Sequence, residues 1–175
     1  MRLSAATNST LLGIPDGSSG TRATLKQMAR LVREYRTNPT IRTCAGDLVQ
    51  FLPGMSYRQE VENIFNFVAG NVRYLQDVNG IDTLQAPDVT LQLRRGDCDD
   101  QVMILCALLE SIGHPTRFVA VGYTQAGIYE HVFCETRIGN EWVALDTTVP
   151  GASVGWRPEP PCTDDYIACR MVHFV

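Results

Sequence analysis

The feature that most constrains this chain is the junction between a short polar turn and a strongly apolar helical stretch. The turn at residues 96–100 has the sequence GDCDD, whereas residues 102–112 carry apolar side chains at the spacing of a helix. Gly113 and then Pro115 predict the end of that helix. The pattern therefore predicts a buried helix with Cys98 in or just before its first turn.

This position gives Cys98 two opposing influences. Unpaired backbone N–H groups and the positive end of the helix dipole favour the thiolate, which is the nucleophilic form of cysteine. The flanking carboxylates, which include Asp97 and Asp99, oppose ionisation and also suit capping of the helix. An inert buried thiol is the plainer interpretation, and it fits Cys106 and Cys134, whose surroundings are apolar. A working nucleophile at Cys98 would need a nearby imidazolium.

One of the three histidines, His131, lies in a predicted strand that continues into a hairpin. If the turn is Gly139-Asn140, Phe133 lies opposite Asp146 on the next strand. His131 then shares a sheet face with Asp146 as its diagonal neighbour, roughly 7 Å away between backbones. A register shift of one residue would separate the pair.

A carboxylate beside His131 would fix the imidazole tautomer and leave the other ring nitrogen to take a proton from a thiol. Cys98, His131 and Asp146 would thus form a nucleophile, base and orienter set. The structural alternative for Asp146 is that it caps the turn at Thr147 and Thr148.

The order of predicted elements is helices first and an antiparallel sheet afterwards. This order predicts an α+β domain with the Cys98 helix packed on the sheet. Residues 40–52 fit either a second short helix or irregular structure, and Ser56 with Gln59 forms a capping-box signature. Helices are expected over 24–35, 56–70 and 88–93, and strands over 116–123, 129–137 and 141–146. The expected organisation is an irregular N-terminal arm (1–22), a folded domain (23–150) and a Pro-rich C-terminal arm (151–175).

Composition excludes several classes of protein. The net charge of −4 and the absence of a basic stripe argue against a nucleic-acid partner. No apolar stretch has the length of a signal peptide core or a membrane span, so we expect a cytoplasmic protein without a membrane partner. The six cysteines are scattered, which favours free thiols, although Cys162 and Cys169 could pair in an oxidising environment.

Three blocks of sequence occur in an order typical of one family. They are GDCDD with the helix that ends in LLESIG, then EHV at 130–132, and WVALDTT at 142–148. Together they resemble the transglutaminase-like superfamily, relatives of papain-type cysteine proteases found in bacteria and phages. The resemblance covers about residues 57–150. It implies a papain-like core, with Cys98 as nucleophile, His131 as base and Asp146 as orienter.

The resemblance implies acyl transfer through a thioester on Cys98. The Cys98 backbone N–H is one oxyanion donor, and Gln92 and Tyr74 are alternative candidates for the second. Many microbial members are regarded as peptidases or amidases, and the chain lacks the Gln-Cys-Trp context of the animal cross-linking enzymes, which argues against transamidation. We expect a peptide or protein substrate and no cofactor.

Two other interpretations compete with this one. A metal site could be built from Asp97, Cys98, His131 and Cys134, but the odd separation of His131 and Cys134 puts them on opposite strand faces, and no closely spaced cysteine pair supports zinc. We therefore expect no metal.

The second competitor is a non-catalytic structural or assembly protein that keeps the same fold. The compact domain with two arms would suit a phage virion or assembly component, located in the host cytoplasm or the virion. The N- and C-terminal arms would contact its assembly partner.

Overall fold

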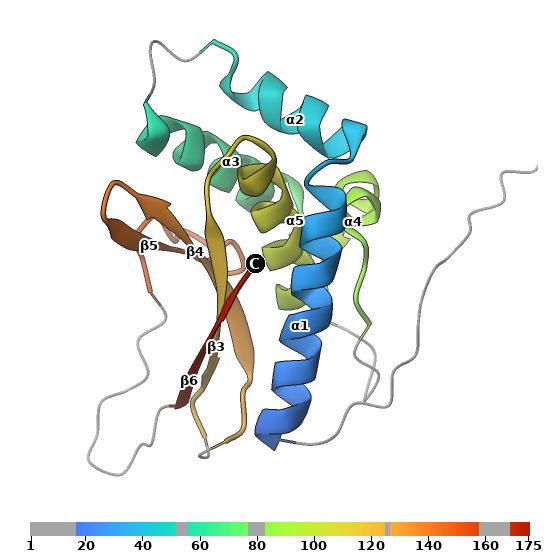
Figure 1. Ribbon diagram of the computed structural model, residues 1–175, viewed down its shortest axis with the longest axis vertical. Coiled ribbons are helices and arrows are strands. Elements are labelled where there is room, and N and C mark those ends of the chain that lie inside the picture. Colours follow the sequence, from blue (N-terminus) through green and yellow to red (C-terminus); the bar gives the residue numbers. More distant parts are fainter. Residues whose placement is uncertain (1–16, 52–55, 77–82, 125–126, 158–168) are drawn as a thin grey trace, which may run out of the picture.

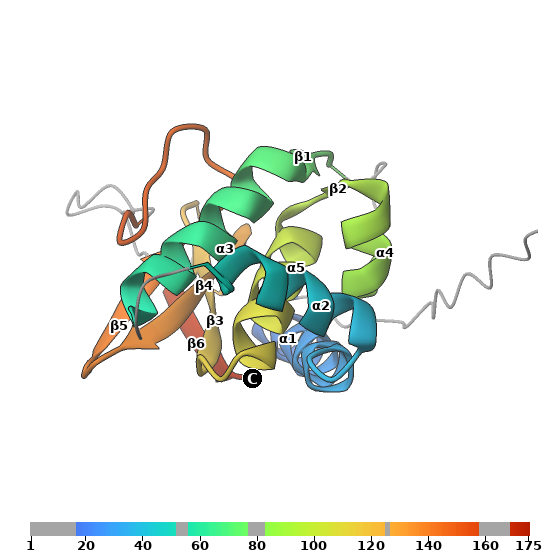
Figure 2. The ribbon, with the colours of Figure 1, turned by 90° about the horizontal axis from the view of Figure 1, so that it is seen from above.

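The computed structural model describes residues 17–51, 56–76, 83–124, 127–157 and 169–175. These residues form a layer of helices on one side of a four-stranded antiparallel sheet (Figures 1 and 2), which confirms the predicted α+β class. The elements in chain order are α1 (Gly17–Tyr35), α2 (Pro39–Val49), α3 (Tyr57–Asn71), β1 (Arg73–Tyr74), α4 (Pro87–Leu93), β2 (Arg95–Gly96), α5 (Cys98–Ser111), β3 (Thr116–Gly122), β4 (His131–Ile138), β5 (Glu141–Leu145) and β6 (Cys169–Phe174). None of the helices in these ranges is long and apolar enough to span a bilayer.

Helix α5 lies at the centre of the molecule, between the sheet and the other helices (Figure 2). Every residue from Asp100 to Leu109 is buried, and α5 packs against α1, α2, α3 and α4 as well as β3 and β4. A helix that is apolar on all sides must be covered on all sides. The burial of α5 therefore gathers the other elements around the helix that begins at Cys98.

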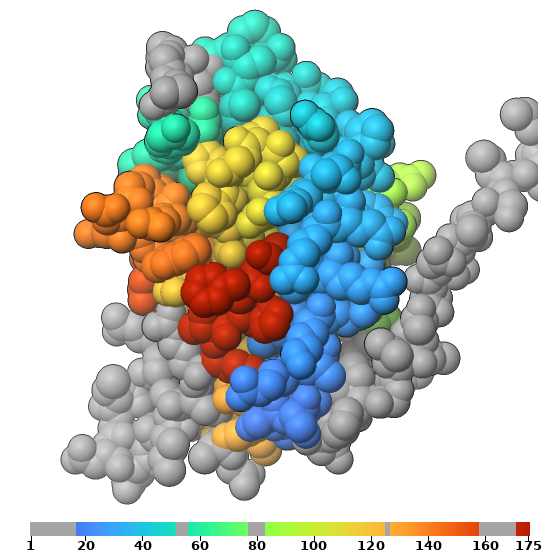
Figure 3. Space-filling view, viewed as in Figure 1, coloured from blue at the N-terminus to red at the C-terminus, as the bar shows by residue number. Residues whose placement is uncertain are grey.

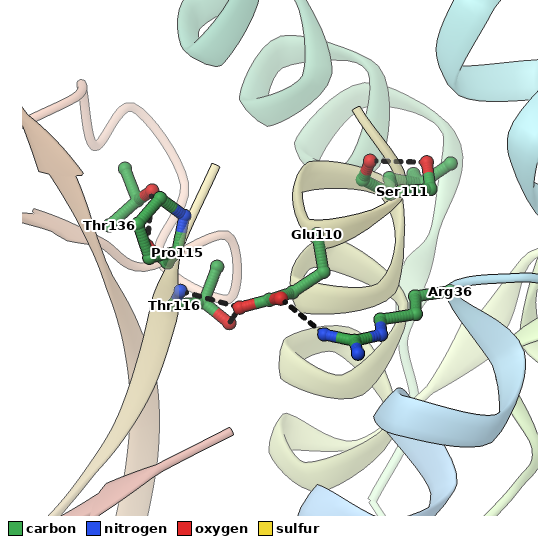
Figure 4. Close-up of polar contacts among 7 residues, drawn as sticks. Arg36, Glu110, Ser111, Pro115, Thr116 and Thr136 are labelled. Carbon is green, nitrogen blue, oxygen red and sulfur yellow. Dashed lines mark hydrogen bonds and ion pairs between the residues drawn. The ribbon is translucent and has the colours of Figure 1, made fainter. Parts of the chain in front are cut away.

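The C-terminal end of α5 is held by the carboxylate of Glu110 (Figure 4). Its Oε1 atom accepts hydrogen bonds from the Thr116 backbone N–H at 2.7 Å and from the Thr116 hydroxyl at 3.0 Å, and Oε2 pairs with Arg36 at 3.1 Å. Glu110 thus joins α5 to the first residue of β3 and to the residue that follows α1.

The sheet has the strand order β5-β4-β3-β6. In the β4–β5 hairpin, Ile138 pairs with Glu141 and Cys134 pairs with Leu145, which is the register predicted from a two-residue turn. Gly139, the first turn residue, has a φ of +61°, the backbone conformation that a type II′ turn requires at that position. The register on which the candidate site depends is confirmed.

The N-terminal arm is shorter than predicted, because α1 begins at Gly17 and not near residue 24. Within this first stretch the Thr21 hydroxyl donates to the Gly17 carbonyl and the Thr24 hydroxyl to the Gly20 carbonyl, both at 3.3 Å. Gly20 is buried, so tertiary packing outweighs the low helix propensity of this segment. Residues 1–16 lie outside the described ranges.

The prediction of a C-terminal arm over residues 151–175 is wrong at its end, because residues 169–174 form β6. This strand pairs antiparallel with β3 along its length and buries Met171 in the core. Figure 3 shows β6 in red beside α1 in blue on one face of the molecule. The Pro-rich residues 158–161 lie outside the described ranges.

Two smaller expectations are also resolved. Residues 39–49 are helical: Pro39 occupies the first turn of α2, and the Asn38 side chain accepts a hydrogen bond from the Thr40 backbone N–H at 2.8 Å. The capping-box prediction at Ser56 gives the start of the helix correctly, but the predicted hydrogen bond is absent. Helix α3 begins after Ser56, but the Ser56 side chain makes no capping hydrogen bond.

The chain enters α5 through a tightly packed junction. Strand β1 pairs in parallel with β2, which places Tyr74 opposite Gly96. The Asp100 carboxylate accepts hydrogen bonds from the backbone N–H of Gln85, at 2.7 Å, and from its side-chain amide. A Cβ atom at position 96 would lie 2.5 Å from the Asp100 Cβ atom. Only glycine fits there without displacing this buried carboxylate.

We expect Gly96→Ala to lower the free energy of unfolding by about 1–3 kcal/mol because it overpacks this junction. Gly46→Ala is the matched control: a Cβ atom at that position in α2 meets no atom within 4 Å, and the substitution should stabilise the protein by about 0.5–1 kcal/mol. Urea unfolding of both variants checks this. Equal effects at the two positions would contradict the packing account.

Candidate active site

The structure places Cys98 at the first residue of α5, as predicted. Asp97 is the N-cap, and its carboxylate accepts a hydrogen bond from the Asp100 backbone N–H at 3.1 Å. The carboxylate of Asp97 therefore caps the helix, as the sequence suggests for the acidic neighbours of Cys98.

His131 and Asp146 are in direct contact at the opposite wall of the site. Nε2 of His131 lies 2.7 Å from Oδ2 of Asp146, and the His131 ring stacks near Phe133 on the same face of the sheet. The contact expected from the hairpin register is therefore present. Because Nε2 is the atom that contacts Asp146, Nδ1 is the ring nitrogen available to a thiol.

Asp146 is buried and well supplied with hydrogen bonds. The Thr148 backbone N–H and hydroxyl donate to Oδ1 at 3.0 and 2.7 Å, so the turn-capping role and the histidine-orienting contact are present together. Burial by itself raises the pKa of Asp146. The hydrogen bond and charge of His131 and the hydrogen bonds from Thr148 lower this pKa by more than burial raises it, so the net shift is downward. Asp146 is therefore held as a carboxylate beside the imidazole.

Cys98 and His131 line one cleft of about 340 Å³ between the start of α1 and the strands β3 and β4. Its wall carries the acidic residues Asp97, Asp99 and Glu130. Cys98, Asp146 and Thr148 also border one packing gap that is too small to hold a water molecule. The three predicted residues, which come from a helix start, a strand start and a strand end, thus gather in one region.

The thiol of Cys98 is directed to an acidic neighbour. Sγ lies 3.8 Å from Oδ1 of Asp99, and among the described residues no hydrogen bond joins Cys98 to His131. Burial raises the pKa of the Cys98 thiol strongly, and the charges of Asp99 and Asp97 raise it further. Backbone N–H groups of Val132 and Asp99 act in the opposite direction but do not compensate. Burial and the carboxylates outweigh the helix dipole, so Cys98 is a thiol at neutral pH.

The two candidates for the second oxyanion donor lie on different elements. Tyr74 lies on β1 opposite Gly96. Its phenol pKa is raised by partial burial and then by electrostatic interaction with Cys98, Asp97 and Asp99, which places it near the site. Both Tyr74 and Gln92, which lies on α4, are exposed. Tyr74 is therefore the candidate whose interactions place it beside Cys98.

Cys134 lies away from the site, in the core. The sulfur of Cys134 is 3.4 Å from that of Cys106. Cys134 pairs with Phe118 on β3, and its side chain lies on the opposite face of the sheet from His131. Among the residues that the structure describes, no group of three or more His, Cys, Asp or Glu side chains is arranged to hold a metal ion.

Sequence reasoning missed Gln101, a buried residue of α5. Its Nε2 donates to the Val72 carbonyl at 3.3 Å, and its Oε1 accepts from the Thr147 hydroxyl at 3.0 Å. A polar residue in an otherwise apolar helix was the available signal, because such a side chain must find partners when buried.

A comparison with known protein families shows the family of the chain. The model of the transglutaminase-like superfamily matches residues 42–147, more than half of the chain, and the chain belongs to that superfamily. The resemblance seen in the three sequence blocks is thereby confirmed. No curated protein matches the chain.

Two solved structures have a similar fold. One, from Parabacteroides distasonis, is provisionally assigned as a protease; its TM-score is 0.59 at 16% identity, over 71% of this chain and 26% of that one. The other, from Cytophaga hutchinsonii, is provisionally assigned as a cysteine protease; its TM-score is 0.53 at 18% identity, over 85% of this chain and 53% of that one. The chain therefore spans only part of both proteins, and at these identities the likeness shows the fold.

The raised pKa of Cys98 predicts slow alkylation by iodoacetamide at pH 7 and a rate that climbs steeply into the alkaline range. Asp99→Asn should raise the neutral-pH rate about fivefold or more, since two charges 4 Å apart repel by at least about 1 kcal/mol. Anionic iodoacetate should discriminate against Cys98 more than against Cys44. Peptide mass spectrometry of each thiol gives these rates. Faster reaction of Cys98 than of Cys44 at pH 7 would contradict the raised pKa of the Cys98 thiol.

The Asp146 carboxylate predicts a pH-dependent stability. Because folding lowers its pKa, Asp146 stabilises the fold above its unfolded pKa of about 3.9, and this contribution is lost as the pH falls through the folded value. Asp146→Asn should cost about 1.5–3 kcal/mol at pH 7 and much less near pH 3. Urea unfolding across this range measures the difference, and a constant difference would be inconsistent with the proposed carboxylate.

Proposed function

We propose that the chain is a cysteine-dependent acyl-transfer enzyme that acts as a peptidase or amidase, with Cys98 as nucleophile, His131 as general base and Asp146 as orienter. The substrate is a peptide or protein. The observation that carries the proposal is the His131–Asp146 hydrogen bond of 2.7 Å at the wall of the cleft that also contains Cys98. Membership of the transglutaminase-like superfamily supports it.

The state of the thiol determines the first step. Because Cys98 rests as a thiol, the S–H proton passes to Nδ1 of His131 as the sulfur bonds to the substrate carbonyl carbon. Asp146 stabilises the imidazolium that forms, and its hydrogen bond keeps the ring in the required tautomer. The carbonyl oxygen becomes an oxyanion next to the backbone N–H of Cys98, which has no partner within the helix at this position.

The second half of the reaction restores the site. The tetrahedral intermediate collapses, the C–N bond breaks, and the amine leaves with the proton held by His131, so that a thioester remains on Cys98. Water then loses a proton to His131 as its oxygen attacks the thioester carbonyl. Collapse releases the carboxylic acid, and the proton on His131 returns to the sulfur. An amine in place of water would give transamidation.

A second candidate function is a structural or assembly protein that keeps this fold without catalysis. One observation favours it: the Cys98 thiol contacts Asp99 and not His131. Its assembly contacts would be the predicted arms, most of which lie outside the described residues.

We expect Cys98→Ala and His131→Ala each to lower turnover of a responsive peptide or amide by about 10²–10⁴-fold or more, because each removes a group that acts in the transition state. Cys44→Ala, which removes a thiol outside the cleft, is the matched control and should retain full activity. Screening a peptide library with mass detection of an acyl adduct on Cys98 supplies the substrate.

Turnover that persists in Cys98→Ala would defeat the proposal. A wild-type protein that forms no acyl adduct with any peptide or activated ester, while folded, would favour the assembly function.

A further inference from the structure

We propose that Gln101 is a positioning residue, which holds the start of α5 against the Asp146–Thr148 turn and thereby sets the distance between the Cys98 sulfur and the His131 imidazole. This inference rests on the proposed function. The juxtaposition that carries it is a fully buried amide, three residues from Cys98, bonded to the residue next to Asp146.

Gln101 is placed to connect the two halves of the site. It is 1% exposed, and its Oε1 atom accepts a hydrogen bond of 3.0 Å from the Thr147 hydroxyl. Thr147 directly follows Asp146, whose Oδ1 atom is held by Thr148. A continuous path therefore runs from the Cys98 helix through Gln101 and the Thr147 backbone to the carboxylate that orients His131.

The other end of the amide is fixed as well. Nε2 of Gln101 donates to the Val72 carbonyl at 3.3 Å, and Val72 immediately precedes β1, which pairs with the strand leading into Cys98. Two hydrogen bonds, one at each polar atom of the terminal amide, restrict both its rotation and its position. An apolar side chain of similar size would fill the space without fixing a direction.

The placement of polar residues along α5 agrees with this role. Of the buried positions 100–109, the two nearest Cys98, Asp100 and Gln101, are polar, and the following eight are apolar. A buried polar side chain costs free energy unless its bonds are made. Asp100 makes its bonds to Gln85, whereas Gln101 makes one of its bonds to Thr147, beside Asp146. Glu110 holds the opposite end of the helix to β3 (Figure 4).

The test uses Thr147→Val, which removes the hydroxyl that donates to Gln101 and conserves the shape of the side chain. Thr136→Val is the matched control, because the Thr136 hydroxyl makes a bond of the same length, 3.0 Å, to the Pro115 carbonyl at the far end of the sheet (Figure 4). The readout is the rate at which p-nitrophenyl acetate acylates Cys98, followed by intact mass, with His131→Ala as the baseline.

We expect Thr147→Val to lower the acylation rate about tenfold toward the His131→Ala baseline, since a small misplacement of reacting groups has a large effect on rate. Thr147→Ser, which keeps the hydroxyl, should restore the rate, and Thr136→Val should remain within twofold of wild type. Gln101→Met combined with Thr147→Val should lose no more than the more impaired single variant, because both remove the same bond. Urea midpoints establish that the Thr147 and Thr136 variants are comparably folded.

Equal rates in the Thr147→Val and Thr136→Val variants would overturn the positioning role and leave Gln101 as a structural residue. If His131→Ala acylates as fast as wild type, the proposed function fails instead, so the two failures are distinguishable.

Discussion

The structure depends on the burial of one apolar helix, α5, whose first residue, Cys98, has acidic residues on both sides. Helix α5 is covered on all sides from Asp100 to Leu109, and the elements that cover it come from both before and after it in the chain. Burial of the helix body brings its N-terminus to the junction between the helical layer and the sheet. Cys98 therefore faces the strand β4 because the helix behind it must be enclosed.

Once α5 is docked, the hairpin register decides which side chains of β4 and β5 reach the cleft that Cys98 also lines. The pairing of Ile138 with Glu141 puts His131 and Asp146 on the same sheet face, within hydrogen-bonding distance. A shift of one residue would send the two side chains to opposite faces. The turn at Gly139 is thus as important for the site as the residues that compose it.

Local signals in the sequence were sufficient for the parts that depend on local geometry. The helix start at Cys98 follows from apolar spacing, and the contact between His131 and Asp146 follows from a turn signal and strand alternation. Tertiary choices were not accessible in this way. The bond between Gln101 and Thr147 joins residues 46 positions apart, and the early start of α1 and the pairing of β6 with β3 depend on core packing. The thiol state of Cys98 was also beyond local reasoning, because it depends on how burial and two carboxylates balance the helix dipole.

The proposed function requires that Cys98, His131 and Asp146 act as one unit. The most direct measurement is the rate of Cys98 acylation by p-nitrophenyl acetate in His131→Ala, Asp146→Ala and the double variant, at matched folding. We expect the double variant to be no slower than His131→Ala, because Asp146 would act only through the imidazole. Rate losses that multiply in the double variant, or a wild-type acylation rate in His131→Ala, would show that the three residues do not act as one unit.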